Sequence, residues 1–223
     1  MSYSRFAIYY VPPEGALADF GSAWLGWDVT RGRAVPQPDL PGLHDITMTA
    51  RGYGFHATLK PPFRLTDGQD AAALARATAD LAATCPAATC AGLTLAVLGG
   101  FLALVPTGDP APLQALAAAC VRDLDAFRAP AGADELARRR QAGLSPRQEA
   151  HLTRWGYPHV LEDFRFHMTL TARLPPDAQA GWRDRIARRL PPLPAPFVVD
   201  RIALCGERAD KRFEVIQSYA LAG

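Results

Sequence analysis

One five-residue pattern, Phe-His-x-Thr-Leu, occurs twice in this chain, at residues 55–59 and again at residues 166–170. Side chains alternate between the two faces of a β-strand, so in each copy the histidine and threonine share one face while the phenylalanine and leucine share the other. Both segments are therefore expected to be strands that bury an apolar face. The opposite face of each strand then presents an imidazole beside a hydroxyl group.

The polar faces of the two copies have a similar composition. They carry His56, Thr58 and Lys60 in the first copy, and Arg165, His167 and Thr169 in the second. An imidazole exchanges a proton near neutral pH, and a hydroxyl two residues along can hold an oxygen atom. The duplication therefore predicts paired acid–base chemistry, with His56 and His167 as the catalytic pair.

A third His-x-Thr sequence, at residues 151–153, serves as an internal control. It lacks the flanking phenylalanine and leucine, and it lies in an arginine-rich segment that begins with Ser145 and Pro146, a pattern typical of a helix start. Residues two apart on a helix do not share a face. We therefore expect His151 to lie outside the functional site.

Composition places the chain among ordinary soluble proteins. It has 223 residues, of which 49% are hydrophobic, and no apolar run is long enough to span a membrane. The N-terminal segment resembles a first strand and not a signal peptide, which predicts a cytoplasmic protein. A net charge of +2 argues against binding of long nucleic acids chiefly by electrostatics. The four cysteines form no Cys-x-x-Cys pair and are expected to be reduced thiols.

The order of predicted elements favours an α+β fold with mainly antiparallel sheets, because strands and helices do not alternate regularly. Strands are expected at 5–11, 93–98, 101–105, 197–204 and 212–221, in addition to the two motif strands. Helices are expected at 16–25, 71–83, 112–127, from 146 to near 156, and 178–190. The proline-rich segment 30–52 is interpreted as a long loop. The duplicated motif predicts one bilobal domain over residues 1–223, with two similar sheets flanked by helices and facing each other across a central cleft.

Longer segments around the motifs carry a family resemblance. GFHATLKPPFRL and WGYPHVLEDFRFHMTLTARL, with the opening strand RFAIYYVPP and the closing strand pair, resemble the two-histidine phosphoesterase superfamily. The flanking residues are similar to a bacterial branch associated with phosphonate-utilisation genes. The resemblance implies a bilobal, pseudo-twofold fold and metal-independent cleavage of a cyclic or strained phosphodiester.

The resemblance also implies roles for the polar residues. His56 and His167 would be the acid and base, and Thr58 and Thr169 would donate hydrogen bonds to the phosphate. From their own chemistry and positions, Lys60 and Arg165 are expected to add positive charge at the rim of the site, and Tyr53 and Tyr157 are candidate substrate contacts. Hydrolysis of a cyclic phosphodiester needs a base to activate water and an acid to protonate the departing oxygen. It also needs donors that hold the nonbridging oxygens.

The sequence contains no motif that indicates a cofactor. Two sets of potential metal ligands, His44 with Asp45 and His56, and His151 with His159 and Glu162, lack a recognised zinc spacing. There is no phosphate loop of the form Gly-x-x-x-x-Gly-Lys-Ser/Thr and no Gly-x-Ser-x-Gly. We therefore expect no metal and no cofactor.

Three functions stay open at this point. The first is metal-independent hydrolysis of a small cyclic phosphodiester, such as a sugar cyclic phosphate from phosphonate breakdown. The second is hydrolysis of a nucleoside 2′,3′-cyclic phosphate, either free or at an RNA end. The third is noncatalytic binding of a phosphorylated ligand or RNA.

Overall fold

The computed structural model describes residues 3–141 and 143–223 and confirms the α+β class. Its centre is a seven-stranded sheet with the order β11-β10-β1-β4-β8-β7-β6, in which every neighbouring pair is antiparallel. Two further pairs of short strands, β2–β3 and β5–β9, lie outside this sheet.

The strands of the large sheet are β1 (Phe6–Tyr10), β4 (Ala57–Phe63), β6 (Gly92–Leu98), β7 (Phe101–Thr107), β8 (Met168–Thr169), β10 (Arg201–Glu207) and β11 (Phe213–Ala220). The short strands are β2 (Trp27–Asp28), β3 (Arg33–Ala34), β5 (Ala88–Cys90) and β9 (Phe197–Val199). The helices are α1 (Ala16–Leu25), α2 (Leu43–Arg51), α3 (Ala71–Thr84), α4 (Ala111–Asp123), α5 (Ala133–Arg140), α6 (Pro146–Trp155) and α7 (Pro176–Ala187), with 3₁₀ turns η1 (Asp125–Phe127) and η2 (Leu161–Asp163).

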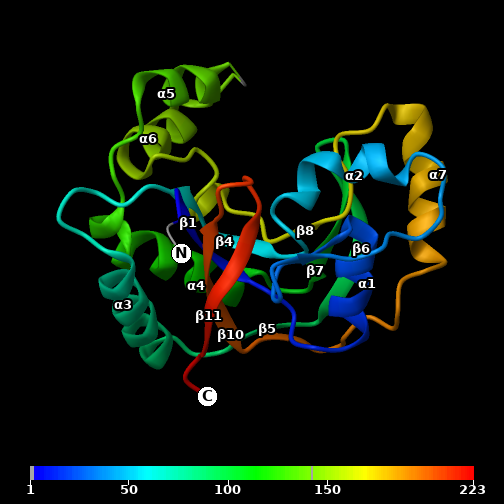
Figure 1. The fold of residues 1–223 in the computed structure, drawn as a ribbon, viewed down its shortest axis with the longest axis horizontal. Helices are drawn as coiled ribbons and strands as arrows, with labels where there is room; N and C mark the ends of the chain where they lie inside the picture. The colour runs from blue at the N-terminus through cyan, green and yellow to red at the C-terminus, as the bar shows by residue number, and fades with distance from the viewer. Residues whose placement is uncertain (1–2, 142) are drawn as a thin grey trace.

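The molecule has two halves that meet at the two motif strands. Helices α3, α5 and α6 lie on one side and α1, α2 and α7 on the other, with β4 and β8 between them (Figure 1). The sequence predicted two sheets, whereas most strands of both halves belong to one sheet, because β4 pairs directly with β8. The two motifs are therefore neighbours in a single ladder.

Two local sequence signals produced the expected elements. Gly99 and Gly100 have φ values of 57° and 95° and join β6 to β7 in a hairpin, since glycine adopts positive φ without a steric penalty. Ser145 accepts a hydrogen bond from the Gln148 amide, and the Gln148 side chain accepts one from the Ser145 amide. This capping box fixes the start of α6.

The interpretation of residues 30–52 as a loop is wrong in its second half, where α2 begins directly after Gly42. The buried residues of α2 are Leu43, Thr47 and Ala50, which lie on one helical face. Only one of them is a large apolar residue, so the helical pattern was weak in the sequence. Tertiary contacts supply the stabilisation that local propensity does not.

The sheet separates a large apolar core from a smaller one. The large core contains Ile8, Leu59, Leu104, Met168 and Leu204 from the strands, together with residues of α3 and α4. The smaller core lies on the other face around Tyr9, Trp27 and Phe213. All four cysteines are free and buried, as expected. In the described part of the chain, no helix combines the length and apolarity needed to cross a bilayer.

Candidate functional site

Both motif strands show the predicted alternation of burial. Phe55, Ala57 and Leu59 in the first copy, and Phe166, Met168 and Leu170 in the second, are buried. The histidine and threonine of each copy are half-buried. The apolar members enter the large core, so the imidazoles and hydroxyls face the opposite side of the sheet.

The register of β4 and β8 brings the two polar faces together. Ala57 pairs with Met168 in an antiparallel ladder. Continuing this register by one residue in each direction sets His56 opposite Thr169 and Thr58 opposite His167. Each histidine is therefore the cross-strand neighbour of the other motif's threonine.

The two imidazoles are oriented by the same kind of hydrogen bond. Nδ1 of His56 lies 2.9 Å from the carbonyl oxygen of Gly54, and Nδ1 of His167 lies 2.7 Å from that of Arg165. A carbonyl only accepts, so Nδ1–H donates in both rings and the neutral imidazole carries its free electron pair on Nε2. The Nε2 atom of His56 lies 3.0 Å from the Thr58 hydroxyl. In both rings Nε2 is thus the atom available for proton exchange.

The surroundings of both histidines favour the neutral imidazole. The pKa of His56 is lowered to about 4, chiefly by burial and to a smaller extent by the nearby His167, and these effects outweigh the Gly54 hydrogen bond, which raises it. The pKa of His167 is also lowered, chiefly by burial, with a smaller contribution from His159. Bound anionic phosphate would oppose these effects because it favours the protonated imidazole.

Aromatic side chains surround the pair. The Tyr9 ring stacks on His56 with centroids 3.8 Å apart and an interplanar angle of 28°. The Tyr53 ring lies 6.3 Å from His56 and stacks on Phe213. Phe101 lies 5.5 Å from His167. Tyr9, Phe101 and Phe213 were not predicted as site residues, because the order of strands in the sheet brings them here and the sequence pattern does not encode that order.

Lys60 does not share the face of His56 and Thr58, and this prediction is wrong. The ladder between β1 and β4 shifts register between Tyr9–Thr58 and Ile8–Lys60, so an extra residue is inserted into β4 and the alternation breaks. Lys60 is 2% exposed, and its Nζ donates to the Val121 carbonyl at 3.0 Å and lies 3.7 Å from Asp125. Its ammonium group therefore lies on the α4 side of the sheet.

The other predicted polar residues lie in two different settings. Arg165 is exposed, and its carbonyl orients His167. Tyr157 lies on the loop after α6, where the Arg139 guanidinium sits 4.7 Å from its ring centroid and His159 lies 5.8 Å away. Tyr157 thus packs against Arg139 of α5, whereas Tyr53 lies beside His56.

His151 lies in a different environment from the motif histidines. Its Nε2 is 3.2 Å from Glu162, and its Nδ1 is 3.4 Å from Asp163. Both carboxylates belong to η2, so His151 connects α6 to the segment that leads into the second motif. Within residues 3–141 and 143–223, no group of three or more His, Cys, Asp or Glu side chains has an arrangement that could hold a metal ion.

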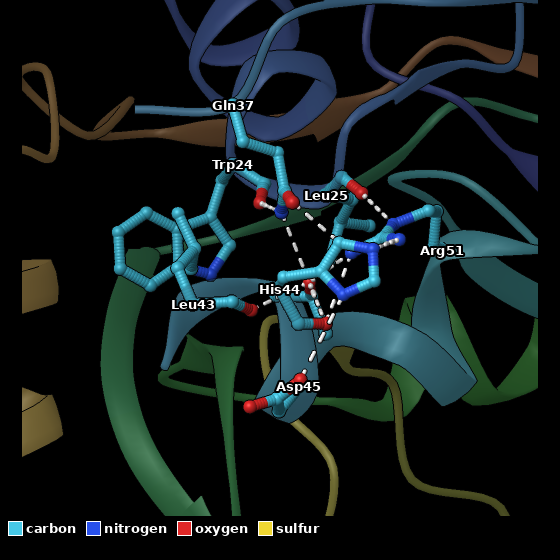
Figure 2. Close-up of polar contacts among 8 residues, drawn as sticks. Trp24, Leu25, Gln37, Leu43, His44, Asp45 and Arg51 are labelled. Carbon is cyan, nitrogen blue, oxygen red and sulfur yellow. Dashed lines mark hydrogen bonds and ion pairs between the residues drawn. The ribbon is translucent and has the colours of Figure 1, made fainter. Parts of the chain in front are cut away.

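The segment that leads into the first motif is held by Arg51, as Figure 2 shows. The Arg51 guanidinium donates to the Leu25 carbonyl at 2.9 Å, to the Gln37 amide oxygen at 3.0 Å and to the Thr47 hydroxyl at 3.0 Å, and it lies 2.7 Å from Nε2 of His44. Burial lowers the pKa of Arg51. These bonds join α1, the loop at Gln37 and the end of α2.

Gly54 lies between this hydrogen-bond network and the imidazole of His56. Its φ is +75°, and a Cβ at this position would lie 2.5 Å from Cβ of Val29. Only glycine combines this conformation with this close approach. The residue is therefore required where its carbonyl oxygen orients His56.

Comparison with known proteins gives three kinds of likeness. A family described as "Protein of unknown function (DUF1045)" matches residues 58–214. Ribose 1,5-bisphosphate phosphokinase PhnN of Janthinobacterium sp. (strain Marseille) is 42% identical over 179 residues, which is 78% of this chain and 40% of that protein. The protein of the same name in Laribacter hongkongensis (strain HLHK9) is 38% identical over 188 residues, covering 82% of this chain and 43% of that protein.

Solved structures with a similar chain include E. coli LigT complexed with 3′-AMP, with a TM-score of 0.49, 14% identity and 98% coverage of both chains. A structure described as a phosphoesterase has a TM-score of 0.44 and 15% identity, with 99% coverage of both chains. The present chain spans about two fifths of the length of the curated relatives it matches. With the family match extending over most of its length, the chain belongs to the DUF1045 family.

Proposed function

We propose that this chain is a phosphoesterase that opens a small cyclic phosphodiester by acid–base catalysis at His56 and His167. The observation that carries the proposal is the β4–β8 register, which sets each histidine opposite the other motif's threonine on one face of the sheet. The matching Nδ1 hydrogen bonds leave Nε2 of both rings for the reaction. Thr58 and Thr169 donate to the phosphate oxygens, and exposed Arg165 adds positive charge beside them.

The protonation states give a sequence of steps. Both imidazoles are neutral before substrate binds, and the phosphate anion raises the pKa of the ring nearest to it, so this ring takes up a proton from solvent. The other, neutral ring removes a proton from a water molecule as the water oxygen bonds to phosphorus. The phosphorus–oxygen bond of the ring breaks, and the protonated imidazole gives its proton to the departing oxygen. The product is a phosphate monoester.

The substrate that we propose is a cyclic phosphate of ribose. The curated relatives are named for ribose 1,5-bisphosphate, and opening a 1,2-cyclic phosphate of ribose 5-phosphate at O2 leaves phosphates on O1 and O5, which is ribose 1,5-bisphosphate. The kinase reaction in that name is not proposed for this chain, because its sequence lacks the Gly-x-x-x-x-Gly-Lys-Ser/Thr phosphate loop. A nucleoside 2′,3′-cyclic phosphate, including one at an RNA end, is the nearest alternative substrate.

The test is turnover by the purified protein in the presence of EDTA, followed by ³¹P NMR, which separates five-membered cyclic phosphates from open monoesters. Ribose 1,2-cyclic phosphate 5-phosphate and nucleoside 2′,3′-cyclic phosphates are offered separately. Opening of the ribose compound with chelator present supports the proposal. Tight binding of every compound without turnover would leave the noncatalytic phosphate-binding function instead.

A further inference from the structure

A cavity lined by three arginines lies where β4 ends and β1 begins. Its ionisable lining residues are Arg5, Arg64, Arg128 and Glu135, so three guanidinium groups face one carboxylate. Neither His56 nor His167 lines it. The arginines come from the segment before β1, the end of β4 and the end of η1, so the fold and not one local segment creates the cluster.

Arg5 and Arg128 are each held by a carboxylate that accepts hydrogen bonds from Nε and Nη2 of the guanidinium group. Arg5 donates through Nε, at 2.8 Å, and through Nη2 to Glu207, which is 3% exposed. Arg128 donates through Nε at 2.7 Å and Nη2 at 3.3 Å to Asp125. Neither Glu207 nor Asp125 lines the cavity. The carboxylates therefore orient the guanidinium groups without occupying the cavity itself.

The third nitrogen of Arg128 is left for another acceptor. Within the residues that the structure describes, Nη1 of Arg128 has no hydrogen-bond partner, whereas Arg5 also faces the Tyr53 side chain. A Cβ built on Gly156, which also lines the cavity, would lie 2.9 Å from Nη1 of Arg128, so this nitrogen is directed toward the cavity wall. Glycine at this position keeps the approach open.

Arg64 is the least neutralised of the three. Its side chain is 61% exposed, and its Nη2 lies 3.8 Å from Glu135, beyond hydrogen-bond distance. Glu135 already accepts a hydrogen bond from Arg139 at 2.6 Å. The cavity is therefore lined by one exposed guanidinium, that of Arg64, and by two that are held by carboxylates.

The cavity is connected to the reactive histidines by Tyr53. This residue lies 6.3 Å from His56 and also interacts with Arg5. Arg5 precedes Tyr9 by four residues, which corresponds to about 13 Å along an extended strand before its own side chain is counted. Consider a substrate whose reacting phosphate lies at the two histidines and whose sugar carries a second phosphate. That second phosphate would extend toward Arg5, Arg64 and Arg128.

We propose that the Arg5–Arg64–Arg128 cavity binds a second phosphate of the substrate, so that the preferred substrate is a sugar cyclic phosphate that also carries a terminal phosphate. This inference rests on the proposed function and names the substrate class more closely. Planar guanidinium groups match the oxygens of a phosphate with two parallel hydrogen bonds, and several of them together suit a dianion.

The experiment compares ribose 1,2-cyclic phosphate with and without a 5-phosphate. We expect the KM of the wild-type protein to be at least tenfold lower for the 5-phosphorylated compound. Arg64→Ala should raise that KM about tenfold and leave the KM for the unphosphorylated compound unchanged. Arg76→Ala, at an exposed arginine of α3 that does not line the cavity, should change neither value.

A binding measurement gives a readout that does not depend on turnover. Calorimetric titration with ribose 5-phosphate should show binding to the wild-type protein that weakens about tenfold in Arg64→Ala. It should also weaken in Ala131→Glu, which adds a carboxylate to the cavity lining. Turnover of both cyclic compounds with equal KM, or binding of ribose 5-phosphate that neither substitution changes, would overturn the inference while leaving the proposed function intact. Absence of turnover of every cyclic phosphate would instead contradict the proposed function, and the titration would still decide whether the cavity binds phosphate.

Discussion

The ring of Tyr9 stacks on the imidazole of His56, with ring centroids 3.8 Å apart, while its buried hydroxyl has no hydrogen-bond partner among residues 3–141 and 143–223. The aromatic ring of Tyr9 therefore supports the imidazole of His56, and the hydroxyl adds only a desolvation cost. Tyr9→Phe should keep the stacking and raise the free energy of unfolding by about 1 kcal/mol, because an unpartnered buried hydroxyl is removed. Urea denaturation measures this change. A loss of more than about 1 kcal/mol would show that the hydroxyl has a partner in solution.

Gly54 provides a test of how the His56 ring is oriented. Gly54→Ala forces a Cβ to within 2.5 Å of Val29 in a conformation that alanine rarely adopts. We expect a loss of about 2 kcal/mol in the free energy of unfolding, from strain and overpacking together. Residual kcat should fall because the carbonyl that orients His56 moves.

Gly68→Ala is the matched control for that change. Gly68 has a similar φ of +82°, but a Cβ there would meet nothing within 4 Å. Gly68→Ala should therefore lower the free energy of unfolding through backbone strain alone and leave kcat unchanged. Equal effects of the two substitutions on kcat would contradict a specific role for Gly54.

The histidine pKa values predict how stability depends on pH. Folding lowers both values below the ordinary 6.5, so between about pH 4 and pH 6.5 the unfolded chain binds more protons than the folded chain. The free energy of unfolding should therefore fall as pH is lowered from 7 to 5. Urea denaturation at both pH values should show a smaller fall in the double variant His56→Gln/His167→Gln. An identical fall in the double variant would place the acid sensitivity elsewhere.

Lys60 and Arg165 were both predicted to add positive charge to the site, but they lie in different places in the structure. Lys60 is buried on the α4 side of the sheet, whereas Arg165 is exposed next to His167. Lys60→Met should leave kcat/KM within about twofold of wild type, because removal of a group outside the site changes no interaction with the transition state. Arg165→Met should raise KM about tenfold through loss of a charge-assisted hydrogen bond. Steady-state kinetics on a cyclic phosphate would contradict the account if Lys60→Met had the larger effect.

The local parts of this structure were predictable from the sequence, and the long-range parts were not. Alternation in both motifs, the Gly99-Gly100 hairpin and the capping box at Ser145 all follow from interactions within a few residues. The direct pairing of β4 with β8 depends on strand order, which periodicity does not encode. The sequence therefore identified the two histidines, but it did not reveal that each lies opposite the other motif's threonine.

The wrong predictions for Lys60 and for residues 30–52 also arise from contacts between segments that are distant in the sequence. Lys60 was placed by strict alternation, and the register shift against β1 that reverses it arises from pairing with a distant strand. Helix α2 was missed because its buried face includes Thr47 and Ala50 in place of large apolar residues. Tyr9 became part of the site only through its position in the neighbouring strand, which sets it beside Thr58.

The central claim is that His56 and His167 act together as acid and base, and mutant kinetics with EDTA present test it most directly. His56→Ala and His167→Ala should each lower kcat on the cyclic phosphate by about 100-fold or more, and His151→Ala should change it little. The double variant should lose much less than the product of the two single losses, because both groups serve one proton-transfer cycle. Turnover that persists at the wild-type rate in either single variant, or that disappears with EDTA in the wild-type protein, would contradict metal-free catalysis by this pair.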